Sequence, residues 1–153
     1  MTAEGENFDL KIVAFCCHYC AYAAADLAGA LRLQYPPSVR VVKLPCTGKL
    51  DVQMVLDAFE RGADGVIVAG CMEGDCHYQQ GNFNAKRRVN YVQSLMRQIG
   101  LEPERVRMVN MSSAMGQQWA QAVTEADATV RKLGPNPLKR KPPVAERDSS
   151  AGQ

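Results

Sequence analysis

The sequence predicts a single α/β domain, with a four-stranded parallel sheet covered by helices on both faces. Short apolar runs typical of strands alternate with longer segments of helical periodicity. Strands that alternate with helices imply a parallel sheet wrapped by helices on both faces. A chain of 153 residues is long enough for one domain that buries about two-thirds of its unfolded surface.

Four apolar runs are expected to form the strands. The first, residues 11–16, ends in a group of cysteines, and the second covers Val39–Leu44. The third, residues 65–69, is apolar throughout and breaks at Gly70, and the fourth covers residues 106–109. Continuous apolar runs of this kind are typical of strands that are buried on both faces of a parallel sheet.

Two helices are expected in the first half of the chain. Residues 21–33 are rich in Ala and Leu, and Pro36 and Pro37 stop this helix because proline cannot donate to the helical ladder. The next helix has Asp51 as its N-cap, carries apolar residues at a 3.6-residue period, and ends at Gly62.

Two more helices are expected in the second half. Residues 84–99 form the first of them, with Gly100 as its stop, and Ser112 or Ser113 caps the last helix, which runs to about Leu133. The complete pattern is that of a flavodoxin-like or Rossmann-like three-layer fold. In such folds ligands bind outside the carboxyl ends of the strands.

The domain is expected to cover residues 11–133. Residues 1–10 form a polar N-terminal extension, and residues 134–153 form a basic, proline-rich tail that we expect to be disordered. The formal net charge of +2 gives no general case for nucleic-acid binding. No apolar run is long enough for a membrane span, and the polar start is not a secretory signal, so we expect a cytoplasmic protein with reduced thiols.

The six cysteines all follow predicted strands, and none lies in a helix body or in the tail. If the first three strands are neighbours, their carboxyl ends bring these thiols to one edge of the sheet. Clustered cysteines in a reducing compartment more often bind metal or perform redox chemistry than form structural disulfides. Five of them are candidate ligands of a metal or cluster: Cys17, Cys20, Cys46, Cys71 and Cys76.

An iron–sulfur cluster of either common size takes four thiolates, so the five candidates leave one spare. Zinc accepts the same ligands. Structural zinc usually organises domains that lack a core, whereas this chain has its own apolar helices and strands. That difference favours a redox centre over a zinc-stabilised adaptor.

Other interpretations use fewer of these residues. A thiol–disulfide oxidoreductase would use Cys17 and Cys20 at a helix N-terminus, where a thiol pKa is lowered, but this leaves the other candidates unexplained. A Rieske-type centre would need His18 and His77 as ligands, yet each directly follows a cysteine, and adjacent residues rarely ligate one site. Cys16 is expected to be a small buried core residue, because it is still within the strand and adjacent residues of a strand point to opposite faces.

A basic segment, residues 86–88, enters a helix after the last cysteines. Its charges would stabilise the reduced form of an anionic cluster, or else form a solvated face. Together with this segment, the aromatic side chains of Tyr22, Tyr78 and Phe83 are candidates for a docking surface.

Several strings of the chain resemble a known family. They lie at residues 15–29, 35–40, 62–65 and 70–82, and the last contains Gly-Asp-Cys-His-Tyr-x-x-Gly-Asn. Over residues 10–130 the chain is similar to the delta subunit of methyl-viologen-reducing hydrogenase, also known as the hydrogenase iron–sulfur subunit.

The resemblance implies a non-catalytic subunit that carries a [2Fe–2S] cluster. Such a subunit relays electrons between a donor module, of hydrogenase or formate dehydrogenase type, and a heterodisulfide-reductase A-like flavoprotein in an electron-bifurcating complex. The cysteines in the matching strings are Cys17, Cys20, Cys71 and Cys76, and Cys46 lies in the intervening turn. The double cysteine at 16 and 17 leaves the first ligand open by one residue.

Overall fold

Four parallel strands form the centre of the molecule. The structure is a computed structural model, and it describes residues 8–72 and 80–138. The strands lie in the order β2-β1-β3-β4, and every neighbouring pair is parallel, which confirms the predicted sheet. Their bounds are β1, Ile12–Cys17; β2, Val39–Leu44; β3, Gly65–Gly70; and β4, Val106–Asn110.

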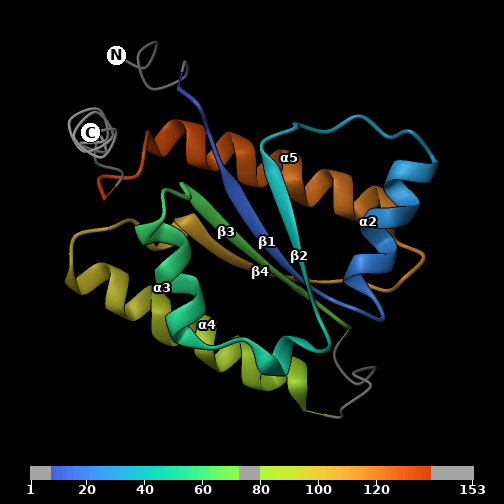
Figure 1. Cartoon of the computed structure of the whole chain (residues 1–153), viewed down its shortest axis with the longest axis horizontal. Coiled ribbons are helices and arrows are strands. Elements are labelled where there is room, and N and C mark those ends of the chain that lie inside the picture. The colour runs from blue at the N-terminus through green and yellow to red at the C-terminus, as the bar shows by residue number, and fades with distance from the viewer. Residues whose placement is uncertain (1–7, 73–79, 139–153) are drawn as a thin grey trace, which may run out of the picture.

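Helices cover both faces of this sheet, as predicted (Figure 1). One face carries α2 (Ala21–Ala30) and α5 (Gly116–Leu133), and the other carries α3 (Val52–Glu60) and α4 (Gly81–Gln98). Two short 3-10 turns, η1 (Thr47–Lys49) and η2 (Pro103–Arg105), precede α3 and β4. Each face therefore has its own apolar core, and the sheet lies between them.

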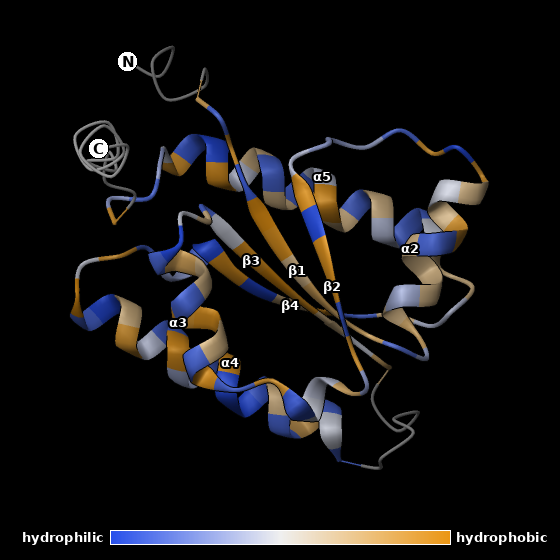
Figure 2. Cartoon of the chain, viewed as in Figure 1, coloured by the Kyte–Doolittle hydropathy of each residue, from blue (hydrophilic) through white to orange (hydrophobic). Residues whose placement is uncertain are grey.

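The strands differ in how completely they are buried. All six residues of β3 are buried, as expected for a central strand, whereas the four middle residues of β2 are exposed at the edge of the sheet. Figure 2 shows hydrophilic and hydrophobic bands along β2. The exposed edge strand carries charged side chains, in line with how edge strands resist unwanted pairing.

The first helix is shorter than predicted. It ends at Ala30 rather than at residue 33, because Arg32 adopts a left-handed conformation with φ of 57°. The backbone N–H of Leu33 then donates to the carbonyl of Ala28 at 3.0 Å and closes the helix. The helix is therefore closed by this backbone turn before Pro36 is reached.

The two C-terminal helices begin at glycines that allow close packing. A Cβ on Gly48 would lie 2.9 Å from the Cα of Gly81, so the start of α4 contacts η1 through backbone, three residues before the predicted start. In α5, a Cβ on Gly116 would lie 3.2 Å from the backbone nitrogen of Ala28 in α2.

The predicted helix caps are confirmed in one case and wrong in another. The Asp51 carboxylate accepts from the Gln53 N–H at 3.2 Å and caps α3, as predicted. In α5 the N-cap is Met115, which makes no side-chain bond, so the predicted serine cap was wrong. The helix starts later than a serine cap would place it, at the glycine that packs against α2.

A buried polar network holds the amino-terminal edge of the sheet. The guanidinium of Arg105, fully buried at 1% exposure, donates to the carbonyl of Asp64 at 3.0 Å and lies 2.7 Å from the Glu102 carboxylate. The Asp64 carboxylate accepts from the backbone N–H groups of Lys11 and Asn136, each at 2.9 Å. Buried charges need partners of this kind.

Asn136 belongs to this network although it follows the predicted end of the domain. Its amide donates to the carbonyls of Phe59 at 2.9 Å and Ala63 at 2.8 Å, and its side-chain oxygen accepts from the N–H of Leu138. The side chain is 2% exposed. The chain just after α5 is thus fixed against α3 and the start of β3.

We expect Asn136→Ala to lower the free energy of unfolding by about 1–3 kcal/mol, because the Ala63 carbonyl loses the amide that donates to it and the Phe59 carbonyl keeps only the Gly62 N–H. Lys132→Ala, on an exposed residue near the end of α5, is the matched control and should change the free energy by less than about 0.5 kcal/mol. Urea unfolding of both variants measures the difference. Equal stabilities would show that the Asn136 side chain does not contribute to the stability of the fold.

Candidate metal centre

Three thiols meet at the carboxyl edge of the sheet. The Sγ atoms of Cys17 and Cys71 are 3.6 Å apart, and with Cys20 all three Sγ atoms lie within 4.8 Å of one another. The prediction that thiols following separate strands converge at one edge is confirmed for these three residues. We refer to them below as the thiol trio.

Each member of the trio is positioned by the end of a regular element. Cys17 is the last residue of β1, Cys71 directly follows β3, and these strands are paired neighbours. Cys20 is the N-cap residue of α2. At this helix start the backbone N–H of Ala21 donates to the Cys17 sulfur at 3.3 Å.

The Cys71 backbone is held by two side-chain amides. The amide of Asn82, at the start of α4, donates to the carbonyls of Cys71 at 3.1 Å and Met72 at 3.0 Å. The amide of Asn110, at the end of β4, donates to the same Cys71 carbonyl at 2.6 Å. Neither asparagine was predicted to have a role. A signal was present for Asn82, which closes the Gly-Asn pair of the matching string, but none marked Asn110.

Cys71 lies in surroundings that oppose a free thiolate. Burial raises the pKa of the Cys71 thiol well above its usual value, and its neighbours Cys20 and Cys17 raise it further. A bound metal offsets this cost because its positive charge stabilises the deprotonated sulfurs. Two thiolates on one tetrahedral metal stand about 3.8 Å apart for metal–sulfur bonds of about 2.3 Å. The Cys17–Cys71 separation of 3.6 Å therefore fits a metal between them.

Cys16 is a core residue, as predicted. It is fully buried, burial and the neighbouring Cys17 raise the pKa of its thiol to about 12, and its sulfur is outside the trio. Both adjacent cysteines pack in the core beneath α2 and α5. Cys16 and Cys17 therefore lie on the same side of the sheet. The expected alternation of adjacent strand residues between the two faces was thus the wrong reason for separating Cys16 from the candidate ligands. The two cysteines differ in position along the strand, because Cys17 is the last residue of β1 and Cys16 precedes it.

Cys46 lies at the same edge but is not one of the trio. It is 8% exposed and precedes η1, where its sulfur accepts from the Gly48 N–H at 3.3 Å. The turn reaches β3, since a Cβ on Gly70 would lie 3.1 Å from the Thr47 hydroxyl oxygen. The fifth candidate, Cys76, lies outside the described residues.

The histidines do not complete the site among the residues that the structure describes. His18 is exposed, and its ring meets the Tyr19 ring edge-on with centroids 4.9 Å apart. No His18 nitrogen belongs to the group of ligand atoms around the trio. His77, like Tyr78, lies outside the described residues.

The basic segment has a structural role at one position. The Arg88 guanidinium donates to the carbonyls of Gly48 and Leu50, the latter at 2.7 Å, and so ties α4 to the turn after Cys46. Its charge is thereby engaged with backbone oxygens, whereas residues 86 and 87 are exposed. Of the aromatic docking candidates, Tyr22 and Phe83 are partly exposed, at 38% and 39%.

Among the described helices, none combines the length and the apolar character that crossing a membrane requires.

Comparison with known proteins gives one consistent family. Residues 12–134 match the family described as methyl-viologen-reducing hydrogenase, delta subunit. The chain is 47% identical over 135 residues to the iron-sulfur subunit of the F420-non-reducing hydrogenase of Archaeoglobus profundus, covering 88% of this chain and 98% of that protein. It is 49% identical over 131 residues to the vhu iron-sulfur subunit of the F420-non-reducing hydrogenase of Methanocaldococcus jannaschii, covering 86% and 98%.

A longer protein contains a similar region. The chain is 41% identical over 131 residues to the A polypeptide of the ferredoxin:CoB-CoM heterodisulfide reductase of Methanosarcina mazei. The match covers 84% of this chain but only 16% of that protein. A region similar to this chain is therefore part of a much larger polypeptide there.

We expect Asn82→Ala to destabilise the fold by about 1–3 kcal/mol and to weaken metal retention, because the Met72 carbonyl loses its donor and the Cys71 carbonyl keeps only Asn110. The control is Asn90→Ala, on an exposed position of the same helix. Thermal unfolding and the metal content after gel filtration measure both effects. If the two variants retain metal equally, the amide does not hold the site.

Proposed function

The chain belongs to the methyl-viologen-reducing hydrogenase delta-subunit family, and from this we propose that it is an electron-transfer protein carrying a [2Fe–2S] cluster. It relays electrons between a donor module, of hydrogenase or formate dehydrogenase type, and a heterodisulfide-reductase A-like flavoprotein. We place this relay in an electron-bifurcating complex of the cytoplasm. Within that complex the chain itself is not catalytic.

The observation that supports this proposal most strongly is the thiol trio, with all Sγ atoms within 4.8 Å. A cluster takes four thiolates, and Cys17, Cys20 and Cys71 supply three of them. The fourth comes from Cys46, which lies buried at the same edge, or from Cys76. Two relatives that match this chain over nearly their whole length are named as iron-sulfur proteins, which supports the same cofactor.

When bound, the cluster supplies a one-electron carrier. The protein holds it and sets its environment through burial and through hydrogen bonds to the sulfurs, both of which influence the reduction potential. Two such bonds are already formed here, from the Ala21 N–H to Cys17 and from the Gly48 N–H to Cys46. Asn82 holds the Cys71 backbone in place beside them, together with the amide from the end of β4.

The relatives support two of the proposed partners. Those of similar length carry the name of a hydrogenase, which supports a hydrogenase-type donor. The similar region inside the heterodisulfide reductase A polypeptide supports a partner of that type, because there the region is covalently joined to the rest of the polypeptide. A formate dehydrogenase-type donor rests on the family resemblance alone.

A zinc-stabilised adaptor is the second candidate, since the Cys17–Cys71 separation suits a tetrahedral zinc as well. A thiol–disulfide oxidoreductase using Cys17 and Cys20 is less well supported. The third thiol, Cys71, lies 3.6 Å from Cys17 and would compete for any disulfide formed there.

We expect the anaerobically purified protein to be brown, with about two irons and two sulfides per chain. Cys17→Ser, Cys20→Ser and Cys71→Ser should each abolish the EPR signal of the dithionite-reduced protein, because each removes a thiolate. Cys16→Ser is the matched control and should keep both iron and signal, since its sulfur lies outside the trio.

Two further variants identify the fourth ligand. Whichever of Cys46→Ser and Cys76→Ser loses the signal marks the ligand, and the other marks the spare thiol. Stoichiometric zinc without iron, in protein that is folded and anaerobically handled, would replace this proposal with the adaptor.

A further inference from the structure

Two neighbouring hollows surround the carboxyl end of β2. The first, of about 360 Å³, is lined by His18, Tyr19, Lys43, Leu44 and Pro45. The second, of about 320 Å³, is lined by Pro45 with Cys46, Gly48, Lys49, Gly81 and Asn84. Because Pro45 belongs to both, the hollows form one continuous surface, which we name the Pro45 rim and define by these ten residues.

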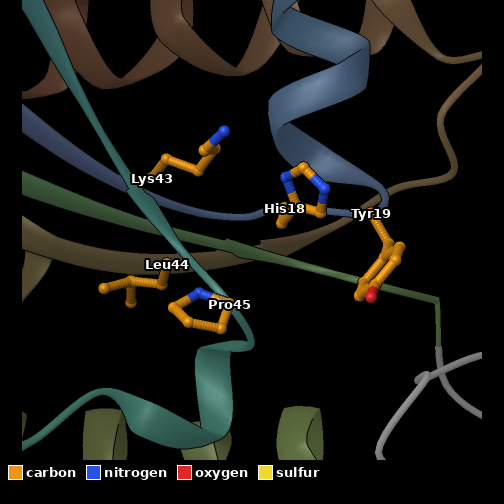
Figure 3. A pocket seen from close by; sticks show the side chains of 5 residues that line it. All are labelled: His18, Tyr19, Lys43, Leu44 and Pro45. Atoms are coloured by element: carbon orange, nitrogen blue, oxygen red, sulfur yellow. The ribbon is translucent and has the colours of Figure 1, made fainter.

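The Pro45 rim lies directly beside the candidate cluster. His18 and Tyr19 form one wall, and they are the two residues between Cys17 and Cys20 of the thiol trio. Figure 3 shows their rings at the end of β1, near the side chains from the end of β2. A protein seated on this rim would therefore be separated from the cluster by little more than the loop that holds it.

The charge of the rim is of one sign. With histidine counted as neutral, the charged residues of the rim are Lys43 and Lys49. None of its ten residues is acidic. The Lys43 ammonium stands 4.8 Å from the centroid of the Tyr22 ring, which holds this charge over the start of α2. The rim thus combines apolar hollows with fixed positive charge.

The middle of β2, the strand that leads to the rim, is exposed to solvent. Val41 and Val42 of β2 are 40% and 39% exposed, and β1 is the only strand that pairs with β2 among the described residues. Successive residues of a strand point to opposite faces. Both faces of β2 are therefore accessible immediately before the rim, so apolar surface extends beyond the hollows themselves.

We propose that the Pro45 rim docks the heterodisulfide-reductase A-like partner, through an acidic segment whose apolar side chain enters a hollow. This proposal rests on the function proposed above. Lys43 and Lys49 can pair with acidic side chains of the partner, and the hollows can accept one of its apolar side chains. The partner is chosen over the donor because a region similar to this chain lies within the heterodisulfide reductase A polypeptide itself. None of the ten rim residues belongs to the predicted docking surface of Tyr22, Tyr78, Phe83 and residues 86–88, although Lys43 of the rim stands over the Tyr22 ring.

The test measures binding of the full chain to the purified heterodisulfide-reductase A-like protein from the same organism, by surface plasmon resonance at several salt concentrations. Lys43→Glu and Lys49→Glu should each slow association by about tenfold at low salt and flatten the salt dependence, because charges at an interface rim act mainly on association. Lys132→Glu makes the same change of charge on an exposed residue at the far end of α5 and should leave association nearly unchanged.

The outcomes separate the two proposals. If the wild-type chain binds and both rim variants behave like Lys132→Glu, the rim is not the docking site, while the proposed function stands. If the chain does not bind this flavoprotein, the docking site and the partner named in the proposed function are both overturned, while the cluster itself is judged by the iron content. If the rim variants weaken binding but the wild-type protein contains no iron, the docking site stands and the proposed function fails. EPR spectra of all variants should match the wild type, which excludes an effect through the cluster.

Discussion

The parallel pairing of β1 with β3 is the constraint on which the site depends. Because both strands run in the same direction and are neighbours, their carboxyl ends lie side by side, and the residues that close or follow them must meet. Cys17 and Cys71 are 54 positions apart in the sequence, yet their sulfurs are 3.6 Å apart. Cys20 joins them because α2 begins where the strand ends.

Different groups of polar side chains lie at the amino and carboxyl ends of the strands. At the amino-terminal edge, Asp64, Arg105 and Asn136 form a buried network of charged and amide groups that joins distant segments. At the carboxyl edge, polar side chains hold the backbone around the thiols. The network that joins distant segments and the groups that surround the thiols therefore consist of different residues.

Much of the fold could be predicted from the sequence, because buried parallel strands and amphipathic helices leave strong patterns. Helix ends were less predictable, since they depend on contacts between distant segments, as between Gly48 and Gly81. The cysteines were evident from their positions after strands. The amide of Asn110 was not, because nothing in an asparagine at the end of a strand indicates that it bonds a carbonyl 39 positions away.

The two hydrogen bonds to the Cys71 carbonyl, from Asn82 and Asn110, have a consequence for electron transfer. A redox centre exchanges electrons quickly when its surroundings rearrange little between the two charge states. Amides from α4 and β4 fix the carbonyl from two separate elements, and neither amide gains or loses a proton. The backbone at Cys71 is thus suited to a small reorganisation energy.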